Sequence, residues 1–479
     1  MGAPAKVTPM TAAQTLGTFI EQCAHIALPR DVADKAAFCM MDAVALGILS
    51  ANDACVQAML STVQHLSHQP GLVRVWATNT HTTLLDAVAT NAFSVHSQFH
   101  DDSEYDSWTH PGSLVVPAAV TLGEQLDATI PHVLQAIAAG YATVSWLGAK
   151  ERVAQALIAH GIRTSPTLGV IGAAAAAAVL LRLDAQHAAH AISIATSLAG
   201  GLLEPVGTGS DEWRLQNAHA SRGGVAAAQL ATNGLQGASL ALEGKNGFLR
   251  AYAGMDILPV TWRTSPDVSA IMGVVAKPFA SLGDNIASAM AAQQLYSEGV
   301  NTNDIAKIDI TLWRPYSKYP GTDYRGPFER DSQALASTIF AVAAMLIFGK
   351  LEYDITRDQR NDTQILNLVQ CAHIHPHDHG PEDSTVTLTL KNGSTLTKNS
   401  AQAPRTLLYH DRPTSIALLE DRLSRSRNAN GVGLQAAQMV FDAIPSQQPQ
   451  SIGRFLDAIT PQTLSKSESE HANLAPILH

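Results

Sequence analysis

Apolar residues recur at helical spacing along most of the first half of this 479-residue chain. From Thr11 to about Val260 they fall every three or four positions, and Thr11 is a residue type that caps helix N-termini. Besides a helix after Thr11, the pattern predicts helices over 38–49, 84–95, 113–126, 132–147, 169–181, 185–203 and 217–234. Hydrophobic residues make up 46% of the chain and charged residues 15%, which favours a compact, largely helical protein over a disordered one.

The pattern changes after Trp262. Residues 308–312 alternate between apolar and polar, as in a half-buried strand. Residues 385–390 and 395–397 flank Asn392-Gly393, which predicts a β-hairpin with a type I′ turn. An apolar stretch over 334–348 predicts a buried helix between these strands.

Helical spacing returns at 415–423, 433–444 and 451–456. We therefore predict a mainly α protein with a large helical domain made from both chain ends and an inserted, smaller α+β lid domain. The expected limits are 1–264 and 405–460 for the helical domain, 265–404 for the lid and 461–479 for a mobile tail.

The charge pattern limits the partners. The formal net charge is −10, and the sequence contains no Lys/Arg cluster that could follow a phosphate backbone, so we expect no nucleic acid partner. The four cysteines are scattered without metal-type spacing, which is typical of a reducing compartment, and we expect a cytoplasmic protein. The first ten residues lack an apolar segment and residues 173–181 are too short to cross a bilayer, so we expect no membrane association.

The densest polar segment, residues 96–113, joins two expected helices. It would place Asp101, Asp102, Ser103 and His110 on one loop, where carboxylates, a hydroxyl and an imidazole can meet. The helix expected from Ser113 would also offer free N–H groups to a carboxylate. From the residues alone the segment is either an active site or a solvated acidic loop.

The sequence supports a metal site or a nucleotide site less well than an active site in the segment 96–113. His96, His100, Asp101 and His110 are metal-ligand types, but Ser97 stands where a zincin has glutamate. A second histidine cluster, 373–379, contains Pro376 and is expected in an exposed loop before the hairpin. Gly207-x-Gly209 lacks the preceding strand of a dinucleotide-binding motif. We expect neither a metal nor a nucleotide.

Six short motifs occur in a recognisable order. They are DAVALG (42–47), His96 followed by DDS (101–103), HPGSLVVPAA (110–119), TLGVIGAAA (167–175), LEGKNGF (242–248) and KPF (277–279). Together they resemble the MmgE/PrpD family over about positions 11–455.

The resemblance implies a helical domain with an inserted lid, an active cleft between them, and usually a homodimer. The family includes 2-methylcitrate dehydratase, cis-aconitate decarboxylase and iminodisuccinate epimerase. It implies cofactor-independent chemistry on small di- and tricarboxylates, in which a bond to hydrogen is made or broken at a carbon beside a carboxylate.

The resemblance also implies site residues. His110 matches the family's His-Pro histidine, Asp101 and Asp102 its paired aspartates, and Ser103 a position where threonine is common. Lys277 matches the lysine that opens the lid and would anchor a carboxylate. Tyr316 or Tyr319 would match a tyrosine after the first lid strand.

Several positions depart from the decarboxylase pattern. Phe99 replaces an aspartate, Arg163 a histidine, Trp213 a lysine and Gln216 a histidine. Arg163 and Arg214 retain positive charge and are expected to bind the substrate, but a guanidinium is a poor proton shuttle. His160 could stand in for the lost histidine or could bind free carbonyls at a helix end.

The matched residues and these substitutions together determine which reaction we expect. We expect His110 to act as base or acid, Asp101 to orient it, and Lys277 with Arg163 to hold substrate carboxylates. Dehydration of a hydroxy-tricarboxylate is the leading hypothesis, and decarboxylation is disfavoured. The alternatives are an epimerase or isomerase of a dicarboxylate, and a carboxylate-binding homologue without turnover.

Overall fold

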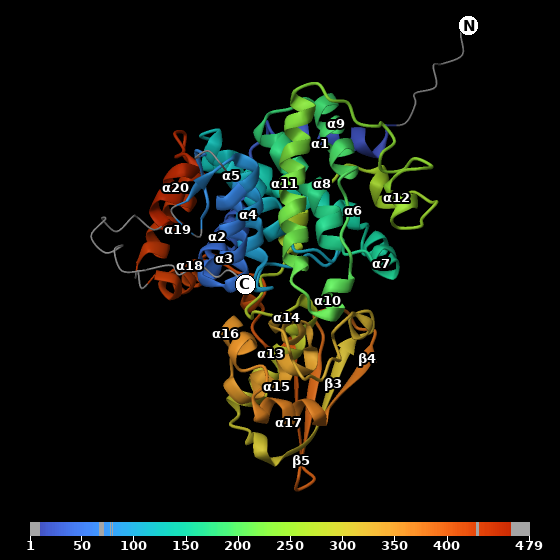
Figure 1. Cartoon of the computed structure of the whole chain (residues 1–479), viewed down its shortest axis with the longest axis vertical. Helices are drawn as coiled ribbons and strands as arrows, with labels where there is room; N and C mark the ends of the chain where they lie inside the picture. The colour runs from blue at the N-terminus through green and yellow to red at the C-terminus, as the bar shows by residue number, and fades with distance from the viewer. Residues whose placement is uncertain (1–9, 67–70, 77, 79, 428–430, 461–479) are drawn as a thin grey trace.

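The structure, a computed structural model, describes residues 10–66, 71–76, 78, 80–427 and 431–460. It contains a larger helical part and a smaller part with a mixed β-sheet (Figure 1), which confirms the predicted fold class. The predicted mobile tail, 461–479, lies outside the described residues. Among the described helices, none combines the length and apolar character needed to cross a bilayer.

The larger part takes its α-helices from both halves of the chain. They are α1 (Ala12–Cys23), α2 (Arg30–Leu49), α3 (Ala54–Leu66), α4 (Leu84–His96), α5 (Val115–Gln125), α6 (Ile130–Gly148), α7 (Arg152–Ala159), α8 (Thr164–Leu180), α9 (Ala185–Thr196), α10 (Glu204–Thr208), α11 (Glu212–Thr232), α12 (Phe248–Ala251), α18 (Arg412–Arg427), α19 (Val432–Ala443) and α20 (Ile452–Ile459). A short strand pair, β1 (Val73–Arg74) and β2 (His81–Thr82), also belongs to this part.

Local sequence explains why these helices form and how closely they pack. Thr11 caps α1 as predicted, in a capping box with Gln14. The small residues of α8 are buried on every side, so neighbouring helices can approach its backbone. A Cβ atom on Gly140 of α6 would lie 2.9 Å from the carbonyl oxygen of Gly172 in α8, so this close crossing requires glycine.

The C-terminal helices return to the larger part. In Figure 1, α18 to α20, in red, lie beside the blue N-terminal helices, and α18 packs on α2. The buried Arg422 of α18 forms an ion pair with Asp42 of α2. Buried residues from 12–274 and 419–459 share one hydrophobic core, whereas a second core uses residues 275–408. The exact domain limits stay a prediction.

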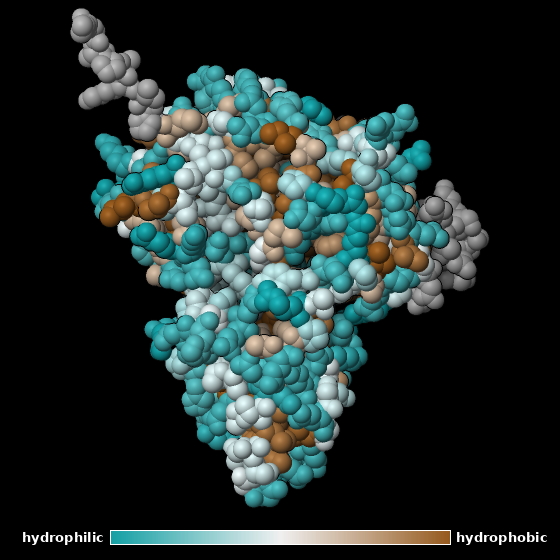
Figure 2. All heavy atoms as spheres, turned by 180° about the vertical axis from the view of Figure 1, so that it is seen from behind, coloured by the Kyte–Doolittle hydropathy of each residue, from teal (hydrophilic) through white to brown (hydrophobic). Residues whose placement is uncertain are grey.

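The smaller part is built on a four-stranded sheet with strand order β4-β3-β5-β6. Its strands are β3 (Ile305–Trp313), β4 (Ala372–His377), β5 (Thr385–Leu390) and β6 (Thr395–Asn399), and its helices are α13 (Ile286–Ser297), α14 (Asp331–Ala336), α15 (Thr338–Phe348), α16 (Tyr353–Asp358) and α17 (Thr363–Cys371). β3 is parallel to β4 and antiparallel to β5. Figure 2 shows this part tapering away from the broader helical part.

Three local predictions differ from the structure. The apolar stretch 334–348 forms two helices, because Ser337 ends α14 and its hydroxyl accepts the Phe340 N–H to cap α15. The hairpin has a three-residue loop instead of a type I′ turn: Leu390 pairs with Ser394, and Gly393 alone in the loop has positive φ. Most of the histidine cluster 373–379 is not a loop: residues 373–377 lie in β4, and only 378 and 379 lie in the loop after it.

Candidate functional site

A small polar cavity lies where the two parts of the molecule meet. Its volume is about 30 Å³, room for no more than a few water molecules. The lining comes from the loop after α4, the segment before α13 and the segment after β3: Ser103, Glu104, Tyr105, Trp108, Thr109, His110, Leu282, Gly283, Asp284, Tyr316 and Tyr319.

The loop after α4 is held in an unusual conformation by contacts to both parts. Phe99 and Trp108 have φ values of 53°, in the left-handed region that costs energy for these side chains. The Phe99 carbonyl accepts from Lys277 Nζ, and the Trp108 carbonyl from the Thr164 hydroxyl. Ser103 pairs with Val275 through two backbone hydrogen bonds of 2.9 and 2.8 Å. The loop is therefore attached to the segment that enters the smaller part.

His110 has the geometry of a general base. Its Nδ1 lies 2.8 Å from the Asp102 carbonyl oxygen, which requires an N–H at Nδ1 and leaves a lone pair on Nε2. The Ser103 hydroxyl lies 3.3 Å from the same Nδ1. Burial, helped by the positive charge of Lys277, holds the pKa of His110 well below its usual value. The ring is therefore neutral at pH 7.

A buried chain of charges runs behind His110. The His96 Nδ1–H donates to Asp101 Oδ2 at 2.8 Å, and His96 Nε2 accepts from an Arg163 N–H at 2.5 Å. Burial lowers the pKa of His96 to about 4, so this imidazole is neutral. Burial would raise the pKa of Asp101, but the hydrogen bond from His96 and the positive charge of Lys277 hold it below its usual value. Asp101 thus supplies a fixed negative charge beside the two histidines.

Asp102 supports the loop through its side chain and orients His110 through its main chain. Its Oδ1 accepts the Gly112 N–H at 2.7 Å, and its Oδ2 accepts the Tyr141 hydroxyl at 2.6 Å. Burial raises the pKa of Asp102 to about 7, although both hydrogen bonds act in the opposite direction. The carboxyl group is absent from the cavity lining.

Lys277 lies near His110 but points into the protein. Its Nζ donates to the carbonyls of Phe99 and Ser281 at 2.5 and 3.1 Å. It lies 5.6 Å from the Phe99 ring centre, and the His110 ring packs on the same ring at 5.8 Å. Burial lowers the pKa of Lys277 to about 8, with Asp101 and Asp102 opposing this effect.

The other predicted cations and His160 have protein partners away from the cavity lining. Arg163 donates to the Trp213 carbonyl at 2.7 Å as well as to His96, so it fixes the histidine instead of facing the cavity. Arg214 donates to the Ser97 carbonyl and to Asp331 Oδ2 at 2.9 Å each, linking α11 to α14. His160 is exposed and its Nδ1 lies 2.8 Å from the Tyr252 carbonyl oxygen.

The cavity does collect the predicted hydroxyl groups. Ser103, Tyr316 and Tyr319 all line it with His110. The aromatic residues Trp108, Trp313 and Tyr316 pack on one another at its edge, with ring centres 4.9 to 5.8 Å apart. Of the three hydroxyl-bearing residues, Tyr316 is therefore held by aromatic packing.

The sequence reasoning missed two carboxyl groups of the cavity. Glu104 accepts from the backbone N–H groups of Asp106 and Ser107, and burial raises its pKa to about 7. Asp284 lies on the opposite wall, and its Oδ2 has no hydrogen-bond partner among the described residues. Glu104 lies on the same loop as His110, within the polar segment 96–113, but no motif singles it out. Asp284 has no spacing signal, because only tertiary packing brings it to this cavity.

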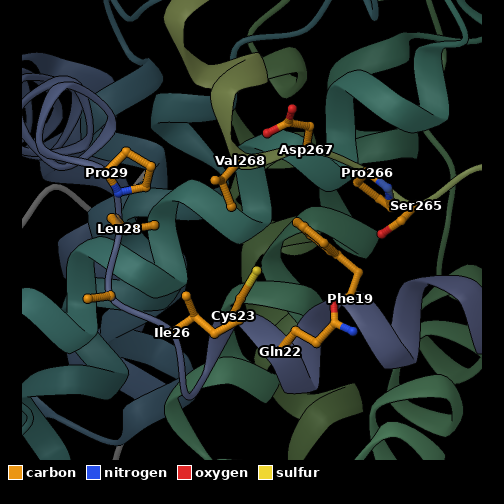
Figure 3. Close-up of a pocket in the computed structure, with 11 residues that line it drawn as sticks. Phe19, Gln22, Cys23, Ile26, Leu28, Pro29, Ser265, Pro266, Asp267 and Val268 are labelled. Atoms are coloured by element: carbon orange, nitrogen blue, oxygen red, sulfur yellow. The ribbon is translucent and has the colours of Figure 1, made fainter.

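A second, larger cavity lies elsewhere in the larger part and has a different character. It measures about 370 Å³, and Figure 3 shows Phe19, Cys23, Ile26, Leu28 and Val268 around it. Burial raises the pKa of Cys23 to about 12, so its thiol is not a ready nucleophile. This cavity lacks the imidazole and carboxyl pair of the smaller one.

Metal ligation has little support from the described side chains. In the ranges that the structure describes, no group of three His, Cys, Asp or Glu side chains could hold a metal ion. His375 lies 2.7 Å from Asp309, and His377 bonds to the Asp383 carbonyl. The residues of the 373–379 cluster are thus engaged in the sheet and the loop after it.

Comparison with known proteins gives distant enzyme relatives. The chain is 26% identical over 330 residues to cis-aconitate decarboxylase of Mus musculus and over 331 residues to that of Homo sapiens. These alignments cover 66% of this chain and 66% and 67% of the two relatives, so the chain spans about two thirds of their length. A cis-aconitate decarboxylase-like protein, oryM of Aspergillus oryzae, is 26% identical over 47% of each chain.

Residues 14–259, more than half of the chain, match the MmgE/PrpD N-terminal domain. That range contains most of α1, all of α2 to α12 and the whole loop that carries Asp101 and His110. The protein belongs to the MmgE/PrpD family.

Proposed function

We propose that this chain is a cofactor-independent lyase of the 2-methylcitrate dehydratase type. Its substrate would be a small di- or tricarboxylate with a hydroxyl group next to an acidic C–H bond. One observation carries the proposal: His110 is a buried, neutral imidazole whose Nδ1 is occupied by the Asp102 carbonyl, so that Nε2 is the base.

The proposed reaction begins with proton removal beside a carboxylate. His110 Nε2 accepts the proton, and negative charge develops on the carboxylate oxygens as an enediolate forms. The hydroxyls of Ser103, Tyr316 and Tyr319 can donate hydrogen bonds to those oxygens. Lys277 acts through its field, because its Nζ is bonded to two backbone carbonyls. Asp101 stabilises the imidazolium that results.

Substrate entry requires the two parts to separate. A cavity of about 30 Å³ is too small for a dicarboxylate, whereas typical ligand pockets measure ~300 Å³ or more. The described conformation would therefore be the closed one, and turnover would require opening and closing on the μs–ms scale.

The experiment is a substrate screen in deuterated water with ultraviolet detection. Citrate, 2-methylcitrate, tartrate and aminodicarboxylates would be tested with wild type and His110→Ala. A dehydratase develops the absorbance of a new conjugated alkene and incorporates deuterium, and His110→Ala should do neither. Exchange without alkene would instead indicate an epimerase, and thermal stabilisation by a ligand without either would indicate a binding protein.

Decarboxylation of cis-aconitate is a second candidate, favoured because the relatives reported above are cis-aconitate decarboxylases. Phe99 and Trp213 argue against it, because these two stacked rings, 4.0 Å apart, stand where the decarboxylase pattern has charged residues. Release of CO₂ from cis-aconitate would support this candidate over dehydration.

We also propose that the protein is a homodimer and that it is located in the cytoplasm. Sedimentation would test the first proposal, and localisation of the tagged protein would test the second.

A further inference from the structure

We propose that Asp284 is the proton donor to the leaving group, opposite His110 in the cavity. This assignment rests on the proposed dehydration and adds a second chemical group to it. The two residues come from different parts of the molecule, His110 from the loop after α4 and Asp284 from the short 3-10 helix Gly283–Asn285 before α13. The cavity is complete only when the two parts meet.

The surroundings of Asp284 differ from those of a structural aspartate. Buried carboxyl oxygens in proteins nearly always have partners. Asp284 is only 9% exposed, yet its Oδ2 has no partner in the described part of the chain. Its neighbour Asn285 shows the structural alternative, with hydrogen bonds to Ser281, Leu335 and Thr338. Asp284 thus lines the cavity with one carboxyl oxygen whose hydrogen-bonding capacity is unused among the described residues.

The chemical environment keeps this carboxyl group protonated. The charged and titratable groups around it are Lys277 on its own segment, Glu104, Tyr105 and His110 on the facing loop, and Tyr316 and Tyr319 after β3. Burial raises the pKa of Asp284 to about 8, and a hydrogen bond from its own backbone N–H, together with the charge of Lys277, offsets this only in part. At pH 7 the group carries a proton and can give it away.

Approach of the two walls depends on a glycine. A Cβ atom on Gly283 would lie 2.9 Å from the Ser103 hydroxyl and 3.9 Å from His110 Cε1. The backbone that carries Asp284 therefore lies directly against the Ser103–His110 pair, with no side chain between them.

The step balances with the groups already present. His110 Nε2 takes the proton from carbon, the C–H electrons form the C=C bond, and the C–O bond to the hydroxyl breaks. Asp284 gives its proton to the departing hydroxyl, which leaves as water. Imidazolium and carboxylate remain, and transfer of one proton from His110 to Asp284 through solvent restores both.

The test separates proton removal from departure of the hydroxyl. Asp284→Asn and Asp284→Ala would be compared with Asp323→Asn, an exposed carboxylate of the smaller part. With a substrate that wild type dehydrates, both Asp284 variants should lose alkene formation by ~10²–10⁴-fold while α-hydrogen exchange with deuterated water continues. Asp323→Asn should match wild type in both assays. Alkene formation within threefold of wild type in either Asp284 variant would overturn the proposal, and so would loss of exchange in a folded variant.

An infrared titration tests the same assignment without turnover. Wild type minus Asp284→Ala should show the C=O stretching band of a protonated carboxyl group at pH 7, and this band should disappear with a midpoint near pH 8. Absence of the band at pH 7 overturns the donor assignment. Wild-type protein that shows the band but neither exchanges nor dehydrates any substrate would overturn the proposed function and the donor role with it, while leaving the protonated carboxyl group established.

Discussion

At the residue scale, the two nitrogens of His110 have different tasks. Nδ1 is bonded to the Asp102 carbonyl and Nε2 is free to accept a proton, so removal of the ring should remove the base. We expect His110→Ala to lower kcat by ~10²–10⁴-fold. His187→Ala, which removes a half-exposed histidine of α9, is the matched control and should leave kcat unchanged. Steady-state rates and thermal melts of both variants measure this, and a fully active His110→Ala protein would remove His110 from the mechanism.

The pH dependence of kcat/KM should report the protonation of His110. Activity needs the neutral imidazole, and burial holds the pKa of His110 well below 6.5. The acid limb of kcat/KM should therefore lie below pH 6.5, where an exposed histidine would already be protonated. A rate profile from pH 4 to 8 measures the position of this limb. A limb at or above pH 6.5 would contradict the neutral, buried base.

Asp284 should also affect the free energy of unfolding. Its folded pKa is raised from 3.8 to about 8, so between these values the folded protein holds a proton that the unfolded chain releases. This group therefore destabilises the fold progressively as pH rises from about 4 to 8, by at most ~1.4 kcal/mol per pH unit. Asp284→Ala should gain stability relative to wild type as pH rises. Urea unfolding at pH 5, 7 and 8.5 tests this, and a constant difference between the two proteins would refute it.

At the element scale, contact between the loop after α4 and the segment before α13 depends on Gly283. An alanine there forces the Ser103 hydroxyl, 2.9 Å from the new Cβ, to rotate away from His110 Nδ1. We expect Gly283→Ala to reduce kcat by up to about tenfold with little change in Tm, because a hydroxyl rotation is inexpensive. Gly273→Ala has open space around its new Cβ and is the control. Equal rates in the two variants would show that the contact does not matter.

The sequence predicted some elements well and others poorly, for identifiable reasons. Local signals were enough for the Thr11 cap of α1 and for β5, because caps and alternation depend on neighbouring residues. Ser337 interrupts an apolar stretch without glycine or proline, so the break between α14 and α15 had no clear signal. In the hairpin, Asn392-Gly393 fits two loop lengths, and the register is set by the pairing of β5 with β6.

The difference between local signals and tertiary packing also explains how much of the candidate site could be predicted from the sequence. The polar density of 96–113 marked one wall of the cavity, since its residues are close in the sequence. The opposite wall was predicted only in part, through Tyr316 and Tyr319. Whether a buried cation faces a cavity or a carbonyl depends on tertiary packing, which is why the sequence could not predict the protein partners of Lys277, Arg163 and Arg214.

At the scale of the whole molecule, function depends on how firmly the two parts close. Contacts between them include an apolar cluster with Phe99 and Trp213 from one part and Leu282 and Leu335 from the other. Three polar contacts join α11 to α14: Arg214 to Asp331 at 2.9 Å, Trp213 Nε1 to Ser332 at 3.2 Å, and Arg214 to the Ser332 hydroxyl at 3.4 Å. These contacts stabilise the closed state but must break or move when substrate enters.

Removal of the ion pair should therefore shift the equilibrium toward an open form. Asp331→Asn keeps the shape but leaves the buried Arg214 guanidinium without its main counter-charge, at a cost of about 1–3 kcal/mol. A loss of ~1.4 kcal/mol changes the closed-to-open ratio tenfold. We expect a larger radius of gyration by small-angle scattering and a higher KM. Asp358→Asn, which breaks the exposed pair with Arg357, should change neither. Unchanged scattering and KM in Asp331→Asn would mean that the ion pair does not help to hold the molecule closed.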